Sequence, residues 1–182
     1  MSAGSDAVTR CAFIVCRITR DGEPHLLLVR DERWGDWTFI GGHEDPEDQR
    51  ELEQTARREA LEELGSVCAR AGFRLMSLTD ELEFGPTWSK SAGMSKRYCF
   101  KFYAMLFDRE PHLGEGVNEA GFQLELFKER DLPGKPGLSN VVNVFLTIFK
   151  DNLECVPFSW SDERDRMPAC SGEKTGALVG LV

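Results

Sequence analysis

The sequence has few of the residues that zinc sites and histidine-dependent nucleophiles require. Only three histidines are present, and none lies near a cysteine pair (His25, His43 and His112). The six cysteines are scattered, without a Cys-x-x-Cys pair. These absences argue against a zinc site and against Ser-His-Asp or Cys-His catalysis. We expect reduced structural thiols, with Cys11 and Cys16 on opposite faces of one strand.

Long apolar runs are also missing. Residues 1–9 lack a basic region followed by an apolar stretch, so no secretory signal is visible. Stretches such as Val141–Phe149 are too short to span a bilayer. We therefore expect a cytoplasmic protein without a membrane partner. The length of 182 residues and the 41% hydrophobic share suit one domain with a real core.

Basic residues are outnumbered, 22 against 31 acidic ones, which gives a net charge of −9. The electrostatic field of this net negative charge repels phosphate backbones, so we expect no duplex nucleic acid partner. The acidic charge is concentrated, because residues 44–63 hold nine carboxylates against three arginines, or −6 of the −9. Two interpretations stay open for this segment: a solvated helix face that could bind a basic protein partner, or a cation site.

The hydrophobic pattern predicts an α/β fold, with a mixed β-sheet between helices. The expected strands are residues 10–19, 25–29, 37–40, 72–82, 97–107 and 122–127. Residues 83–96 are expected to form a loop. The expected helices are residues 44–64, ending at Gly65, and 138–153, with Ser139 as N-cap. We expect one domain over residues 1–156 and a loosely held tail over residues 157–182.

Three glutamates of the acidic segment share one helix face. With Glu59 at 0° and about 100° per residue, Glu62 falls near 300° and Glu63 near 40°. The segment contains no lysine that could relieve their repulsion. Hard oxygen ligands in this arrangement suit Mg²⁺ or Mn²⁺, and such a cation supports hydrolysis at phosphorus.

Residues 58–65, Arg-Glu-Ala-Leu-Glu-Glu-Leu-Gly, resemble the core of the Nudix box, R-E-U-x-E-E-x-G-U, where U is aliphatic. Residues 37–42, Trp-Thr-Phe-Ile-Gly-Gly, are similar to the family's W-x-L-P-G-G approach. The resemblance covers residues 37–66 and implies a Nudix-type α/β/α sandwich. It also implies Mg²⁺-dependent hydrolysis of a diphosphate bond in a nucleoside diphosphate linked to another moiety.

The chain departs from the family pattern in the loop and the helix start. The family has thirteen residues between its first glycine and the arginine, whereas fifteen separate Gly42 from Arg58. Counting back from Arg58 places Arg50 where the upstream glutamate belongs, with Glu51 and Glu47 as offset candidates. Asp45 followed by Pro46 predicts that the two extra residues form an additional turn.

The resemblance also implies roles for individual residues. The expected metal ligands are Glu59, Glu62, Glu63 and the carbonyl of Gly42, with Arg58 fixing the carboxylates. The general base would be Glu63, or a glutamate from a later loop, namely Glu119 with Glu115 as its competitor.

Other side chains and partners are open at this stage. His43 could approach the substrate, Lys96 and Arg97 could hold a distal phosphate, and Trp37 and Phe39 could stack a base or belong to the core. The expected partner is a small-molecule nucleoside diphosphate derivative, and a second copy of the chain is a further candidate. The alternative function is a Nudix-fold binding or regulatory module without hydrolase activity.

Overall fold

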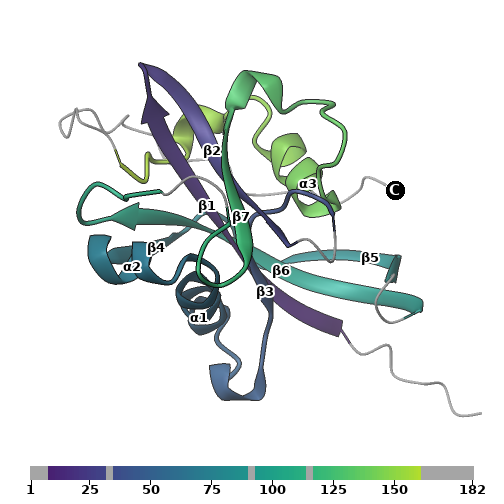
Figure 1. Cartoon of the computed structure of the whole chain (residues 1–182). Coiled ribbons are helices and arrows are strands. Elements are labelled where there is room, and N and C mark those ends of the chain that lie inside the picture. Colours follow the sequence, from purple (N-terminus) through teal and green to yellow (C-terminus); the bar gives the residue numbers. More distant parts are fainter. Residues whose placement is uncertain (1–7, 32–34, 90–92, 114–116, 161–182) are drawn as a thin grey trace, which may run out of the picture.

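A mixed β-sheet with helices on both faces forms the centre of the fold (Figure 1). The computed structural model describes residues 8–31, 35–89, 93–113 and 117–160. The strands within these ranges are β1 (Val8–Arg20), β2 (Glu23–Asp31), β3 (Ile40–His43), β4 (Phe73–Ser77), β5 (Leu82–Ser89), β6 (Met94–Phe107) and β7 (Phe122–Lys128). The helices are α1 (Leu52–Leu64), α2 (Ser66–Ala71) and α3 (Asn140–Ile148), with 3₁₀ turns η1 (Pro46–Asp48), η2 (Glu129–Asp131) and η3 (Leu153–Cys155).

Strand β1 organises the sheet because both of its edges are paired. One edge runs parallel to β6 over residues 8–15. The other edge pairs antiparallel with β3 over residues 11–14 and with β2 over residues 16–20. The main path of the sheet is β4-β6-β1-β2-β7. This arrangement confirms the mixed sheet expected from the sequence.

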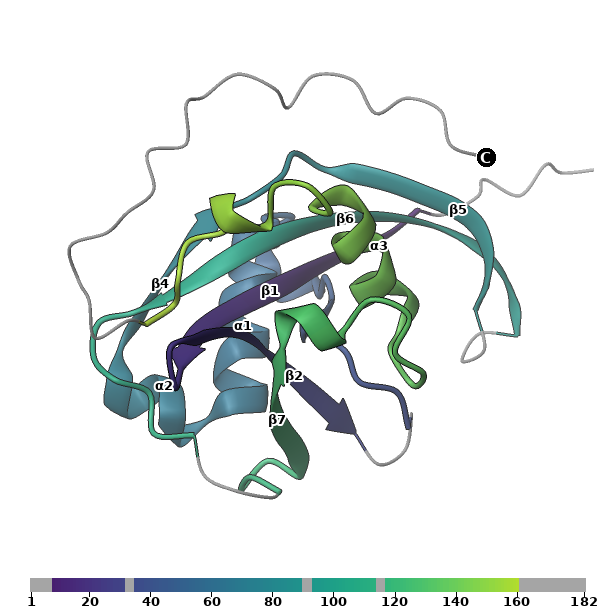
Figure 2. The same ribbon diagram turned by 90° about the horizontal axis from the view of Figure 1, so that it is seen from above.

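The two faces of the sheet carry separate cores. Ala12, Ile14 and Cys16 of β1 pack in one cluster with α1 and α2, whereas Cys11 and Val15 pack in a second cluster with α3. Alternate residues of a strand point to opposite faces, which explains the division. Figure 2 shows α1 and α3 on opposite sides of the sheet. The α/β/α layering and the opposite placement of Cys11 and Cys16 are therefore confirmed.

Three predictions about the sheet are wrong. The strand expected over residues 72–82 is shorter, because β4 ends at Ser77 and β5 begins at Leu82. The third strand was expected over residues 37–40, but β3 begins at Ile40 and continues through both glycines, because Gly41 and Gly42 pair with Phe13 and Ala12 of β1. The expected loop over residues 83–96 is instead largely β5 and the start of β6. The Gly85-Pro86 pair, which favours a loop, is accommodated as an irregularity in the β5–β6 pairing.

The acidic segment is not one continuous helix as expected. A turn is present at the predicted place, because η1 follows Asp45 and begins at Pro46, but its residues Pro46–Asp48 are not the two extra ones. Gln49 and Arg50 then adopt left-handed backbone angles, with φ of 54° and 62°, and α1 begins only at Leu52. At its other end, α1 stops at Gly65, whose N–H donates to the Leu61 carbonyl, as predicted. Helix α2 was not predicted.

The end of the described chain is bonded to the sheet. The N–H of Ser159 donates to the Arg17 carbonyl, and its own carbonyl accepts the N–H of Phe107. Ser159 is buried. These contacts hold the first residues of the segment that was expected to be a loose tail, and residues 161–182 lie outside the described ranges. Helix α3 follows its predicted N-cap, Ser139, but is shorter than expected. Among the described residues, no helix has the length and apolarity needed to cross a membrane.

Candidate active site

Two glycines of β3 allow strand β1 and helix α1 to approach each other closely. Gly41 has φ of 142°, and a Cβ there would lie 2.1 Å from the backbone oxygen of Ala12. A Cβ on Gly42 would lie 2.5 Å from Oε1 of Glu59. A side chain at position 41 would meet backbone, and one at position 42 would displace the Glu59 carboxylate, so the glycine pair sets the distance between the sheet and the carboxylates of α1.

The three glutamates of α1 differ in their surroundings. Glu63 is buried at 7% exposure, and its Oε2 accepts the N–H of Gly41 at 3.2 Å. The Glu59 side chain is 12% exposed and lies against Gly42, whereas that of Glu62 is 57% exposed. The helix thus presents two carboxylates toward the glycine pair and one at the rim.

The pKa of Glu63 is raised to about 8, first by burial and then by the neighbouring charge of Glu59, with smaller contributions from Glu62 and Asp31, and the hydrogen bond from Gly41 opposes this change. Burial also raises the pKa of Glu59, although the Arg58 guanidinium opposes that change. Two partly desolvated carboxylates of like sign are stabilised by a proton or by a cation. The site therefore favours a bound positive charge.

A pH dependence follows from the raised pKa. The folded metal-free protein keeps a proton on Glu63 up to about pH 8, whereas an ordinary glutamate releases it near pH 4.5. The resulting stability is fully present below pH 4.5 and is lost as the pH rises through 8. In EDTA, the melting temperature should fall by several degrees between pH 5 and pH 8.5. Thermal unfolding of wild type and Glu63→Gln measures this, and an equally steep decline in both would contradict the assignment.

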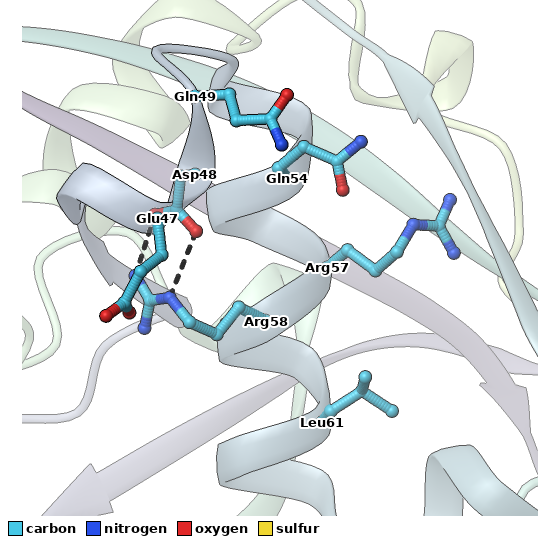
Figure 3. Close-up of a pocket in the computed structure, with 7 residues that line it drawn as sticks. All are labelled: Glu47, Asp48, Gln49, Gln54, Arg57, Arg58 and Leu61. Carbon is cyan, nitrogen blue, oxygen red and sulfur yellow. Dashed lines mark hydrogen bonds and ion pairs between the residues drawn. The ribbon is translucent and has the colours of Figure 1, made fainter.

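Arg58 connects three segments around these carboxylates. Its Nη1 donates to Glu59 Oε1 at 2.9 Å and to Glu62 Oε2 at 3.1 Å. Its Nη2 donates to the carbonyl of His43 at 2.8 Å. The guanidinium also contacts Asp48, as the dashed lines in Figure 3 show. Arg58 therefore ties β3 and η1 to the acidic face of α1.

Asp48 is a residue that the sequence analysis missed. It is 4% exposed and accepts from Arg58 at 3.1 and 3.2 Å, from Thr55 Oγ1 at 2.9 Å and from the N–H of Asp45 at 2.8 Å. The hydrogen bonds from Arg58 lower the pKa of its carboxyl group. Asp48 is the sixth residue after Gly42, the place the family glutamate takes when counted forward from the glycine. The two extra residues therefore lie between Asp48 and Arg58, and neither Glu47 nor Glu51 takes this position.

Removal of the Asp48 charge should weaken the fold. Asp48→Asn leaves the Arg58 guanidinium without its buried counter-charge, and we expect a loss of about 2 kcal/mol in the free energy of unfolding. The exposed neighbour Glu47 provides the matched control, Glu47→Gln, with an expected change within about 0.5 kcal/mol. Urea unfolding measures both, and equal stabilities of the two variants would contradict the role given to Asp48.

A surface pocket of about 360 Å³ opens beside this network (Figure 3). The turn η1 forms one wall and the outer face of α1 the other, with lining residues Glu47, Asp48, Gln49, Gln54, Arg57, Arg58 and Leu61. The turn η1 thus shapes the surface next to Arg58.

The loop before β7, which contains Asn118 and Glu119, reaches the carboxyl end of α1. A carboxylate oxygen of Glu119 accepts the N–H of Ser66 at 3.1 Å, and the Asn118 side chain donates to the carbonyl of Glu63. Hydrogen bonds from Ser66 lower the pKa of Glu119. Glu115, the competitor for the role of base, lies outside the described residues.

The remaining candidates fall into two groups. Trp37 is buried against Phe127, and Phe39 is fully buried among core aromatics, which confirms the core interpretation for both. His43 is at the surface beside the site, and its pKa is lowered by partial burial and by the charge of Lys96. Lys96 therefore lies near His43, and Arg97 is exposed next to it on β6.

Comparison with known families agrees with this geometry. The sequence model of the NUDIX domain matches residues 8–141. The chain belongs to the Nudix family. No curated protein sequence matches it.

Solved structures support the Nudix fold. NrtR of Shewanella oneidensis aligns with a TM-score of 0.56 and 17% identity over 84% of this chain and 70% of that chain. The NUDIX domain of the same protein, complexed with ADP ribose, gives 0.53 and 16% over 79% and 88%. A NUDIX hydrolase from Nitrosomonas europaea gives 0.53 and 19% over 78% and 86%. The Shewanella protein was also solved with a 27mer DNA, and that comparison gives 0.50 and 16% over 77% and 60%.

The donor set of this Nudix box fits a hard divalent cation. Glu59, Glu62, Glu63 and the Gly42 carbonyl offer only oxygen, the ligand type of Mg²⁺ and Mn²⁺. The absence of a Cβ on Gly42 leaves the Glu59 carboxylate directly against the backbone. Within the described ranges, no three acidic, histidine or cysteine side chains already converge as a metal site, and Arg58 Nη1 bridges Glu59 and Glu62. For Glu62 to join this donor set, its exposed side chain would have to turn inward.

Proposed function

We propose that this Nudix protein hydrolyses a diphosphate bond in a nucleoside diphosphate linked to another moiety, with Mg²⁺ or Mn²⁺ as cofactor. The observation that carries the proposal is a pair of neighbouring carboxyl groups facing the glycines of β3, that of Glu63 buried and that of Glu59 largely buried. Water attacks one phosphorus, and the products are two phosphorylated halves or a monophosphate and pyrophosphate.

Glu59, Glu62, Glu63 and the carbonyl of Gly42 would hold the cation. When bound, the cation offsets the negative charge that develops on the diphosphate. Arg58 orients Glu59 and Glu62 through charge-assisted hydrogen bonds, and Asp48 holds Arg58 in place.

Glu63 is the base that we propose. Its Oε2 is held by the Gly41 N–H, which leaves Oε1 to accept a proton from the attacking water. Its pKa of about 8 in the metal-free protein indicates a carboxylate that gains a proton more readily than an exposed glutamate. The carboxylate of Glu119, the other candidate for the base, instead accepts a hydrogen bond from the Ser66 N–H.

The substrate class is tested with purified protein, Mg²⁺ and a panel of ADP-ribose, nucleotide sugars and dinucleoside polyphosphates. ADP-ribose comes first because it is the ligand in the Shewanella oneidensis NUDIX domain complex. We expect at least one compound to be cleaved and EDTA to abolish the reaction. Phosphate release after treatment of the products with phosphatase measures the turnover. Failure to cleave any compound would contradict the hydrolase proposal.

A Nudix-fold binding or regulatory module is the second candidate. Its supporting observation is the Arg58 bridge between Glu59 and Glu62, which neutralises two of the proposed ligands without a metal. This candidate predicts that ADP-ribose binds but is not cleaved. The net charge of −9 still favours a small-molecule ligand over duplex DNA, and a mobility-shift assay with duplex DNA tests that point. Cytoplasmic location and a homodimer are further parts of the proposal, and light scattering tests the latter.

A further inference from the structure

The junction between α1 and α2 brings the end of one helix next to the start of another. Helix α1 ends at Leu64, and α2 begins at Ser66, with Gly65 alone between them at φ of 50°. The last turn of a helix leaves carbonyls without partners, and the first turn leaves N–H groups without partners. A loop that docks here must offer a donor to one helix and an acceptor to the other.

Asn118 and Glu119 meet both requirements. The Asn118 amide donates to the carbonyl of Glu63 in the last turn of α1. The adjacent Glu119 carboxylate accepts the N–H of Ser66, the first residue of α2, at 3.1 Å. The donor lies at the partially negative end of one helix and the carboxylate at the partially positive end of the other, so each side chain has the favourable polarity.

The loop that carries this pair is fixed to the sheet. Asn118 Oδ1 accepts the N–H of Ala120 at 3.0 Å and that of Phe122 at 2.9 Å. The backbone N–H of Asn118 donates to the carbonyl of Phe122 at 2.8 Å. Phe122 begins β7, which pairs with β2. The Asn118 side chain therefore connects the end of α1 to the first residue of β7 and fixes the helix end relative to the sheet.

Glu63 is consequently held at two points. The N–H of Gly41 on β3 holds its carboxylate, and the loop before β7 holds its main-chain carbonyl through Asn118. One contact comes from the sheet and the other from a loop bonded to β7, so together they determine where the carboxylate lies relative to Glu59 and Gly42.

We propose that Asn118 and Glu119 are positioning residues, which lock the α1–α2 junction and thereby fix Glu63, and that Glu119 acts as a helix cap instead of a general base. This inference rests on the proposed function of Glu63. A cap needs only an acceptor oxygen, whereas a base needs an ionisable group. The two roles of Glu119 are therefore separable by a substitution that keeps the oxygen and removes the charge.

The experiment compares Glu119→Gln with Glu119→Ala, and Asn118→Asp with wild type. Glutamine keeps an acceptor for the Ser66 N–H but cannot take a proton at pH 7. Asn118→Asp keeps the acceptor for Ala120 and Phe122 but presents an oxygen to the Glu63 carbonyl. The assay measures kcat, KM and the Mg²⁺ concentration for half-maximal rate, with circular dichroism as a check of folding.

We expect Glu119→Ala and Asn118→Asp to lower kcat about 10-fold and to raise the Mg²⁺ requirement, with KM nearly unchanged. Glu119→Gln should restore most of the kcat that Glu119→Ala loses. If Glu119→Gln instead lowers kcat as far as Glu63→Gln does, Glu119 is the base and the inference is overturned. It is also overturned if all three variants match wild type.

The failure of the hydrolase proposal is distinguishable from these outcomes. It would appear as an inactive wild type, and Mg²⁺ affinity measured by calorimetry would then take the place of kcat. Weaker binding by Asn118→Asp and Glu119→Ala than by Glu119→Gln would still support the positioning role. Equal affinities in all variants, or no binding by any protein, would overturn it.

Discussion

Glu63→Gln should lower kcat about 10³-fold, with little change in KM. The glutamine still accepts the Gly41 N–H, so the main chain of α1 stays in place, but its side chain can neither accept a proton nor supply a charged metal ligand. Steady-state kinetics on the cleaved compound of the panel, at saturating Mg²⁺, measures the effect.

The loss of activity should not come from a loss of stability. Replacing a buried carboxylate that is repelled by Glu59 removes an unfavourable charge, so the melting temperature in EDTA near pH 8 should be equal to or above that of wild type. The control is Glu53→Gln, an exposed glutamate of the same helix paired with Arg57, which should keep full activity. Wild-type kcat in Glu63→Gln would show that another residue is the base.

Gly42→Ala should lower activity in a protein that stays folded, whereas Gly41→Ala should lower the stability of the fold. The new Cβ at position 42 would meet Oε1 of Glu59 at 2.5 Å, and that carboxylate is the far end of a flexible side chain that can move. We therefore expect a folded protein with kcat lowered about 10²-fold and a weakened Mg²⁺ dependence, because Glu59 is displaced.

At position 41 the Cβ would lie 2.1 Å from the Ala12 carbonyl oxygen, at a φ of 142° that side chains rarely adopt. Backbone cannot yield as a side chain does, so we expect a loss of about 3 kcal/mol or more in the free energy of unfolding. Urea unfolding together with kinetics distinguishes the two variants. An unfolded Gly42→Ala protein, or one as active as wild type, would contradict the packing of Glu59 on Gly42.

The acidic face of α1 was predictable because helical geometry is local. The angles between Glu59, Glu62 and Glu63 follow from 3.6 residues per turn and need no knowledge of the remaining chain. The difference in burial among these three glutamates was not predictable. Burial of Glu59 and Glu63 depends on the approach of Gly41 and Gly42, which pair with β1 residues about thirty positions earlier in the chain.

The break before α1 was missed for a similar reason. The composition of residues 44–64 favours a continuous helix, but Gln49 and Arg50 adopt left-handed angles. Asp48, which precedes these two residues, accepts hydrogen bonds from Thr55 and Arg58, seven and ten residues further along the chain. Counting only backward from Arg58 placed the extra residues on the wrong side of Asp48. Counting forward from Gly42 as well would have found it.

Strand β5 shows the limit of local propensity in a sheet. The two glycines, the proline and the serines of residues 83–96 favour a loop, yet β6 begins as early as Met94 and offers an edge with which β5 pairs. Pairing with a long neighbouring strand outweighs residue preference, and that partner cannot be identified from the segment itself.

Calorimetric titration of Mg²⁺ and Mn²⁺ into the protein at pH 7.5 tests the central claim most directly, because it requires no substrate. We predict one divalent cation site in wild type and in Glu53→Gln, and binding weakened at least about 10-fold in Glu59→Gln. Absence of binding by wild type, or equal binding by Glu59→Gln, would contradict the assignment of the carboxylate face of α1 as a cation site.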